Sequence, residues 1–179
     1  MKKAVITAVA LTLALCLAVG GTLAYLTAKT GEVKNTFTVG DVGITLEETK
    51  GNTFQLIPGT KYQKDPTVAV TADTNVDCYV FVKIEESADF DSYVTYTVAD
   101  GWTLLSGDVY YRVVNTTDSV KSFAVIKDNE VIINSNIVKA NPAEGQVVMP
   151  KAAPTLTFTA YAVQKENVAD AAAAWNLVK

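Results

Sequence analysis

Short segments rich in β-branched and aromatic residues recur from residue 36 onward, and this pattern constrains the fold more than any other feature of the chain. Such segments are typical of strands, and Gly, Pro, Asn and Asp separate most of them. The expected strands lie at residues 36–39, 42–47, 67–71, 79–84, 94–98, 109–114, 122–126, 131–133 and 155–163. Short strands without intervening helices predict an all-β, jelly-roll-like antiparallel sandwich.

Two of the expected strands alternate in polarity, which indicates which side chains face a core. The residues expected on the buried faces are Val80, Val82 and Ile84 in one strand and Leu156, Phe158, Ala160 and Ala162 in the other. After the last strand, Asn167 is expected to cap a short helix from Val168 to about Leu177. We expect this helix to cover one end of the sandwich through Val168, Ala172 and Trp175.

The first 24 residues read as a secretory signal peptide. Lys2 and Lys3 precede an apolar run at residues 4–19, and small residues then lead to a cleavage site between Ala24 and Tyr25. A permanent membrane anchor is the alternative, but a spanning helix needs about 20 apolar residues. The expected organisation is a signal at 1–24, an N-terminal arm at 25–35 and a β-sandwich domain at 36–179.

The charge of the chain indicates which binding partners it lacks, and its cysteine content indicates whether it can form a disulfide. All 19 acidic residues follow the signal, and the chain has a formal net charge of −4. We therefore expect no nucleic acid as a partner, and no membrane after processing. Cys16 leaves with the signal, so Cys78 has no intramolecular partner for a disulfide. A lone Cys in an apolar strand is typical of a small buried hydrophobe.

The chain contains no histidine, which removes most catalytic and metal-binding arrangements. No phosphate-binding loop occurs either, so we expect no enzyme, no cofactor and no metal centre. Residues 73–77 (DTNVD) space their side-chain oxygens like the start of a calcium loop. An EF-hand would then need Gly and Glu where the chain has Cys78 and Ile84, so a polar loop is expected, and a weak cation site there stays open.

Several stretches resemble one family of secreted proteins. Residues 21–27 (GTLAYLT) resemble the export signal recognised by the SipW-type signal peptidase. Residues 35–48 (NTFTVGDVGITLEE) resemble the first strand pair of the TasA/camelysin (CalY) group of Gram-positive bacteria. Further similar stretches are Leu56–Gly59 with Lys64–Val68, and Ala160–Gln164 with Ala173–Trp175.

The resemblance implies a structural protein of the cell surface or the extracellular biofilm matrix. It also implies fibres in which the N-terminal segment of one subunit enters the sheet of the next as a donated strand. The donor would begin at Tyr25 and place Tyr25, Leu26 and Val33 against its neighbour. The expected partners are other copies of this chain, the signal peptidase and other matrix proteins.

Two other functions are considered. The first is a monomeric cell-surface binding module, whose contact residues would be the rigid aromatics Trp102, Tyr110 and Tyr111. Packing in the core is the alternative interpretation of these three side chains. The second is a camelysin-like metalloprotease, which the missing histidines and the absence of a metal-binding motif count against.

Overall fold

The computed structural model describes residues 41–179. The signal peptide, its cleavage site at Ala24 and Tyr25, the proposed donor residues Leu26 and Val33, and the first expected strand lie outside the described residues. Between residues 41 and 179, no helix is both long enough and apolar enough to cross a membrane.

One layer of the fold is a four-stranded antiparallel sheet. In spatial order it contains β12 (Leu156–Gln164), β4 (Cys78–Glu86), β7 (Val109–Val114) and β6 (Thr103–Ser106). β4 and β12 pair along their whole length, from Leu156 opposite Glu86 to Gln164 opposite Cys78. The two long strands are rich in Val, Phe, Thr and Tyr, which suit a pleated and half-buried surface.

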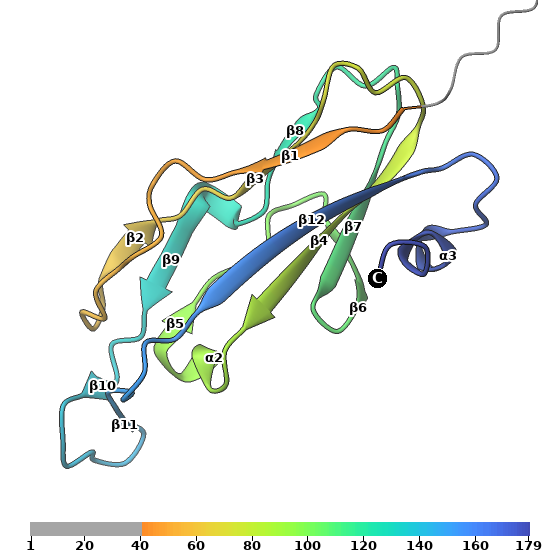
Figure 1. The fold of residues 1–179 in the computed structure, drawn as a ribbon. Coiled ribbons are helices and arrows are strands. Elements are labelled where there is room, and N and C mark those ends of the chain that lie inside the picture. The colour runs from red at the N-terminus through yellow and green to blue at the C-terminus, as the bar shows by residue number, and fades with distance from the viewer. Residues whose placement is uncertain (1–40) are drawn as a thin grey trace, which may run out of the picture. The chain divides into compact units, whose positions relative to one another are not determined.

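The other layer consists of two smaller antiparallel sheets that follow one another along the sandwich (Figure 1). The first contains β1 (Ile44–Glu47), β3 (Thr67–Val70) and β8 (Ser122–Ala124); the second contains β2 (Lys61–Gln63), β9 (Glu130–Ile133) and β5 (Val94–Thr95). The remaining elements are α2 (Phe90–Tyr93), a 3-10 turn at Lys127–Asn129, the parallel pair β10 (Ile137–Val138) and β11 (Val147–Val148), and α3 (Ala171–Trp175).

The main core lies between the layers and confirms the predicted alternation. Val80, Val82 and Ile84 of β4 are buried there against Val68 and Val70 of β3. The even-numbered residues of β12 pack onto the same core: Leu156, Phe158, Ala160 and Ala162. The prediction of an all-β antiparallel sandwich with a short C-terminal helix is therefore confirmed.

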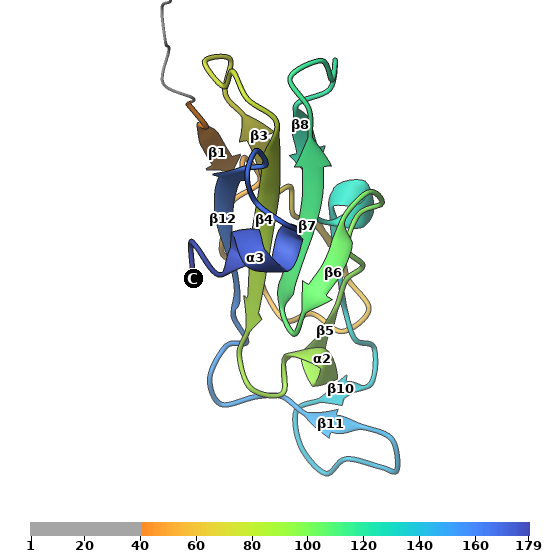
Figure 2. The ribbon, with the colours of Figure 1, turned by 90° about the vertical axis from the view of Figure 1, so that its right-hand side faces the viewer.

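A second apolar cluster covers the opposite face of the four-stranded sheet. Tyr79 and Phe81 point to this face, and Ala171 and Ala174 of α3 are buried against it. Figure 2 shows α3 lying across the sheet, over β4 and its neighbours. The helix thus covers a face of the sheet, and the expectation that it covers one end of the sandwich is wrong.

The start of this helix also differs from the sequence prediction. Its N-cap is Asp170, whose carboxylate accepts a hydrogen bond from the backbone N–H of Ala173 at 2.8 Å. Asn167 instead has a left-handed backbone with φ of 61° and lies in the turn before the helix. Both residue types are good caps, and the turn at Asn167 moves the start of the helix three residues along the chain.

Most expected strands are present with small shifts of their ends. The segment expected at 94–98 is shorter, because β5 ends at Thr95 and only Val98 forms a further bridge, to Ile126. Sequence patterns missed four strands, namely β2, β6, β10 and β11. They are short, at two to four residues each, and none has enough residues to show a clear alternation.

Candidate assembly edge and adjoining groove

β12 is the outermost strand of its sheet, and its hydrogen-bonding pattern shows which backbone groups point away from β4. The N–H of Ser87 donates to the carbonyl of Thr155 at 3.0 Å, and the N–H of Lys165 donates to the carbonyl of Asp77 at 2.8 Å. Odd-numbered residues therefore exchange hydrogen bonds with β4. In an antiparallel pair the alternate residues point to the other side. The outward groups belong to Leu156, Phe158, Ala160 and Ala162.

Within residues 41–179, no strand pairs with this outer edge of β12. β1 lies beside β12 in Figure 1, but it forms a ladder only with β3. An edge of nine residues without a bulge is long for a folded protein, since unpaired N–H and C=O groups invite a further strand. The length and regularity of β12 make it the best candidate for pairing with another chain.

The edges on the other side of the sandwich are protected. The indole Nε1–H of Trp102 donates to the carbonyl of Ala124, at the end of β8, at 2.8 Å. The bridge between Val98 and Ile126 covers the continuation of that strand. β6 is short and shifts register between Leu104 and Ser106, and such bulges oppose pairing with a further strand.

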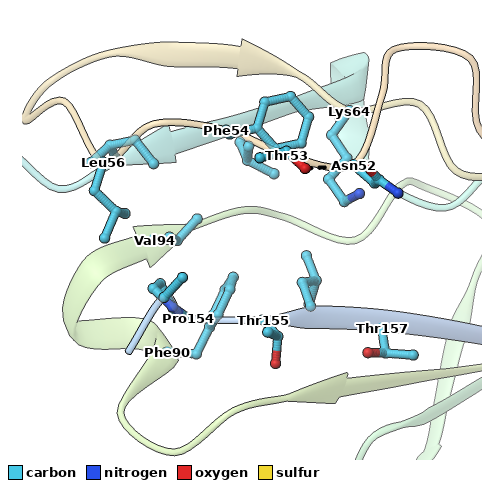
Figure 3. Close-up of a pocket in the computed structure, with 14 residues that line it drawn as sticks. Asn52, Thr53, Phe54, Leu56, Lys64, Phe90, Val94, Pro154, Thr155 and Thr157 are labelled. Atoms are coloured by element: carbon cyan, nitrogen blue, oxygen red, sulfur yellow. Dashed lines mark hydrogen bonds between the residues drawn. The ribbon is translucent and has the colours of Figure 1, made fainter. Parts of the chain in front are cut away.

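A groove of about 430 Å³ adjoins the start of β12 (Figure 3). Its walls come from five separate parts of the chain: residues 52–56, Lys64, α2 with β5, β9, and residues 153–157. The apolar lining residues are Phe54, Leu56, Phe90, Val94, Val131, Ile133, Ala153, Pro154 and Leu156. Because apolar side chains dominate, the groove suits an apolar side chain or a small apolar molecule.

One charged side chain lines the groove. Lys64 is buried, with only 9% of its side chain exposed, and its ammonium forms an ion pair with Glu48. The ammonium lies 5.6 Å from the centre of the Phe54 ring and 5.5 Å from that of Phe158. Lys64 therefore bridges the segment after β1 and the strand β12, and its charge is compensated by Glu48 and both rings.

The next residue, Asp65, holds the same segment. Its carboxylate accepts hydrogen bonds from the backbone N–H groups of Thr49 and Lys50, at 3.0 and 2.9 Å, and from the Thr49 hydroxyl at 2.5 Å. The hydroxyl bond is the largest influence lowering the pKa of Asp65, and both backbone bonds act in the same direction. Asp65 is therefore an ionised anchor for the chain that follows β1.

The aromatic residues considered as a binding surface do not lie together. Trp102 and Tyr110 pack against the main core, and Tyr111 packs on the opposite face of the sheet near Tyr79 and Phe81. All three side chains are half-buried. This placement favours the interpretation of these residues as packing groups.

The loop with calcium-like spacing uses its oxygens within the chain. Asp73 accepts a hydrogen bond from the Thr71 hydroxyl, and Asp77 accepts from the Thr116 N–H at 2.7 Å and from its hydroxyl at 3.1 Å. The side-chain oxygen of Asn75 accepts from the N–H of Asp41 at 3.0 Å. No group of three or more His, Cys, Asp or Glu residues suited to a metal occurs in the described part of the chain.

Cys78 is fully buried in the main core, so the prediction of a small buried hydrophobe is confirmed. Burial raises the pKa of its thiol.

The sequence did not predict the groove or the outer edge of β12, although Leu156 and Phe158 were expected to face the core. No signal in the sequence could show that residues 52–56 close over the start of β12.

The fold and this edge define a class: a small antiparallel β-sandwich with one long edge strand that lacks a partner among the described residues. No protein-family model, curated protein or solved structure matches the chain.

Proposed function

We propose that this chain is a secreted structural subunit of the extracellular matrix or surface fibres of a Gram-positive bacterium. Subunits assemble head to tail, with the N-terminal arm of one copy added as a strand to the next. The observation on which the proposal depends is the outer edge of β12, which has no partner among residues 41–179. The signal-like N-terminus and the resemblance to the TasA/camelysin group also support it.

The proposed donor and acceptor agree in length. The arm at residues 25–35 would span about 36 Å as an extended strand, and the nine residues of β12 span about 30 Å. Added beside β12, the arm would pair with outward N–H and C=O groups such as those of Phe158 and Ala160. A large apolar side chain of the arm, such as Tyr25 or Leu26, would fill the groove beside Leu156.

Charge favours the same pairing. The arm has two lysines, Lys29 and Lys34, and one acidic residue, Glu32, whereas the rest of the processed chain has an excess of acidic residues. Attraction between a basic arm and an acidic body accelerates encounter and is screened by salt. We expect assembly to slow as the ionic strength rises.

Electron microscopy of two purified chains tests the proposal. The chain that begins at Tyr25 is expected to form filaments, and the chain that begins at Thr36 is expected to stay monomeric. Adding a synthetic peptide of residues 25–35 to the shorter chain should cap its edge and raise its Tm. A chain from Tyr25 that stays monomeric at every concentration, and behaves as the shorter chain does, would contradict strand donation.

Proline substitutions distinguish the outer edge of β12 from its inner ladder. Ala160→Pro removes an N–H that points away from β4, so filaments should be lost while the monomer stays folded. Thr159→Pro removes an N–H that faces β4 and should lower the Tm strongly. If Ala160→Pro forms filaments as the parent does, β12 is not the acceptor.

A further inference from the structure

The segment between β1 and β2 covers the groove, and it belongs neither to the sheet of β1 nor to the sheet of β2. Residues 48–56 contain no helix or strand, and most of their side chains are exposed. Four of them, Asn52, Thr53, Phe54 and Leu56, line the groove. Figure 3 shows Phe54 and Leu56 on one side of the groove and Phe90 and Pro154 on the other. Removing this segment would leave the apolar residues of the opposite wall open to solvent.

The attachments of the segment are concentrated at its beginning. Glu48 pairs with Lys64, and Thr49 and Lys50 donate three hydrogen bonds to Asp65. Two adjacent residues of opposite charge between β2 and β3 therefore hold three consecutive residues after β1. Hydrogen bonds to a charged acceptor are roughly twice as strong as neutral ones.

The middle of the segment is held by side-chain packing. The Phe54 ring lies 5.3 Å from the ring of Tyr62, centre to centre, and 5.6 Å from the ammonium of Lys64. The hydrogen bonds that Thr53 and Gln55 make are local: the Thr53 hydroxyl donates to Asn52, and the carbonyl of Gln55 accepts from Ile57. Lys64 thus takes part in both attachments, since it pairs with Glu48 and contacts Phe54.

We propose that residues 48–56 form a lid over the groove and that Lys64 and Asp65 are its latch. Opening the lid would expose the apolar walls of the groove and the start of β12 without disturbing either sheet, because the segment forms no ladder. The inference goes beyond the proposed function, because it concerns the opening of a segment within a single subunit.

Limited proteolysis of the purified chain measures opening directly, because Lys50 lies in the lid and trypsin cleaves after lysine. Asp65→Asn should accelerate cleavage after Lys50 about tenfold, the effect of losing one strong hydrogen bond. Lys64→Met keeps the apolar stem and should act in the same direction. Cleavage after Lys83, within β4, reports global unfolding and should not change.

Asp77→Asn is the matched control, because Asp77 also accepts hydrogen bonds from the backbone and hydroxyl of a threonine, Thr116, at the other end of the sandwich. It should leave cleavage after Lys50 at the parent rate. The lid is contradicted if Asp65→Asn leaves that rate unchanged, or if it accelerates cleavage after Lys83 equally.

Binding of the neutral apolar dye N-phenyl-1-naphthylamine tests what the lid covers. Asp65→Asn should increase the fluorescence of the dye, and adding Ala153→Trp should abolish the increase, since Ala153 lines the groove. An increase that survives Ala153→Trp would place the dye elsewhere, and no increase would show that the groove stays closed. Either result would overturn the proposal.

Discussion

The guanidinium carbon of Arg112 lies 3.5 Å from the centre of the Phe123 ring. This contact connects β7 of one layer with β8 of the other, on the side of the sandwich away from β12. Arg112 is opposite Val80 in the sheet, so its side chain points inward from β7. Trp102 lies on the same guanidinium, 5.3 Å from ring centre to carbon. The cation and the two rings therefore connect β7 of one layer, and the residue just before β6, with β8 of the other layer.

This stack should matter for stability, because it combines packing of a long side chain with cation–π attraction. Arg112→Ala is expected to lower the free energy of unfolding by about 2–3 kcal/mol. Arg112→Lys loses the planar stacking and should have about half that effect. Urea denaturation followed by tryptophan fluorescence measures both, with the exposed Lys151→Ala as control. Equal stabilities of Arg112→Ala and the parent would show that the stack contributes nothing.

Gly101 is expected to be sensitive to substitution, because its φ is positive and the same guanidinium lies close to it. A Cβ at this position would lie 2.9 Å from Nη2 of Arg112, and the backbone φ is +87°. Gly101→Ala combines this clash with backbone strain and should cost about 1–3 kcal/mol in urea denaturation. Gly51→Ala is the control, since its φ of +85° is similar but nothing lies within 4 Å. If the two variants lose equal stability, the loss comes from backbone strain alone and the contact with Arg112 contributes nothing.

The N-cap of α3 is Asp170 in the structure, whereas the sequence predicts Asn167, and substitutions can distinguish the two. Asp170→Ala removes the hydrogen bond to the N–H of Ala173 and should cost about 1 kcal/mol. Asn167→Gly should cost little, because glycine adopts the left-handed conformation of this residue freely. Thermal unfolding of both variants decides between the two caps. A larger loss at Asn167 would move the cap back to that residue.

Stability in alkaline solution should depend on Cys78. Burial raises the pKa of the folded thiol above its ordinary value of 9.0, so the folded state retains the proton that the unfolded state releases. The stabilising effect is present below pH 9.0 and is lost as the pH rises through the higher folded pKa. Urea denaturation from pH 7 to 10 should show a decline that Cys78→Ala reduces. A parallel decline in the variant would assign it to other groups.

Asp77 should contribute to stability at neutral pH. The backbone N–H of Thr116 is the largest influence that lowers the pKa of Asp77 below 3.8, and the Thr116 hydroxyl adds to it. Its contribution is therefore present above pH 3.8 and lost as the pH falls through the lower folded value. Urea denaturation at acidic pH should show a shallower decline for Asp77→Asn than for the parent. An unchanged slope would contradict this role, and Asp100→Asn serves as an exposed control.

Alternation along single strands was sufficient to predict which side chains face the core. The sequence assigns Val80, Val82 and Ile84 to the core, and the structure agrees. This success has a physical reason: a strand places successive side chains on opposite faces whatever its neighbours are.

Other features needed the tertiary structure, because they join residues far apart in the chain. Phe54, Phe90, Val131 and Leu156 meet in one groove, although no motif links their positions. Likewise, a run of Leu, Thr, Phe and Ala shows that 156–164 is a strand, but only the order of strands shows that it lies at an edge. The sequence by itself determined the longer strands, which of their residues face the core, and the absence of histidine. Which edge stays open, and what covers the groove, depended on long-range packing that local periodicity does not encode.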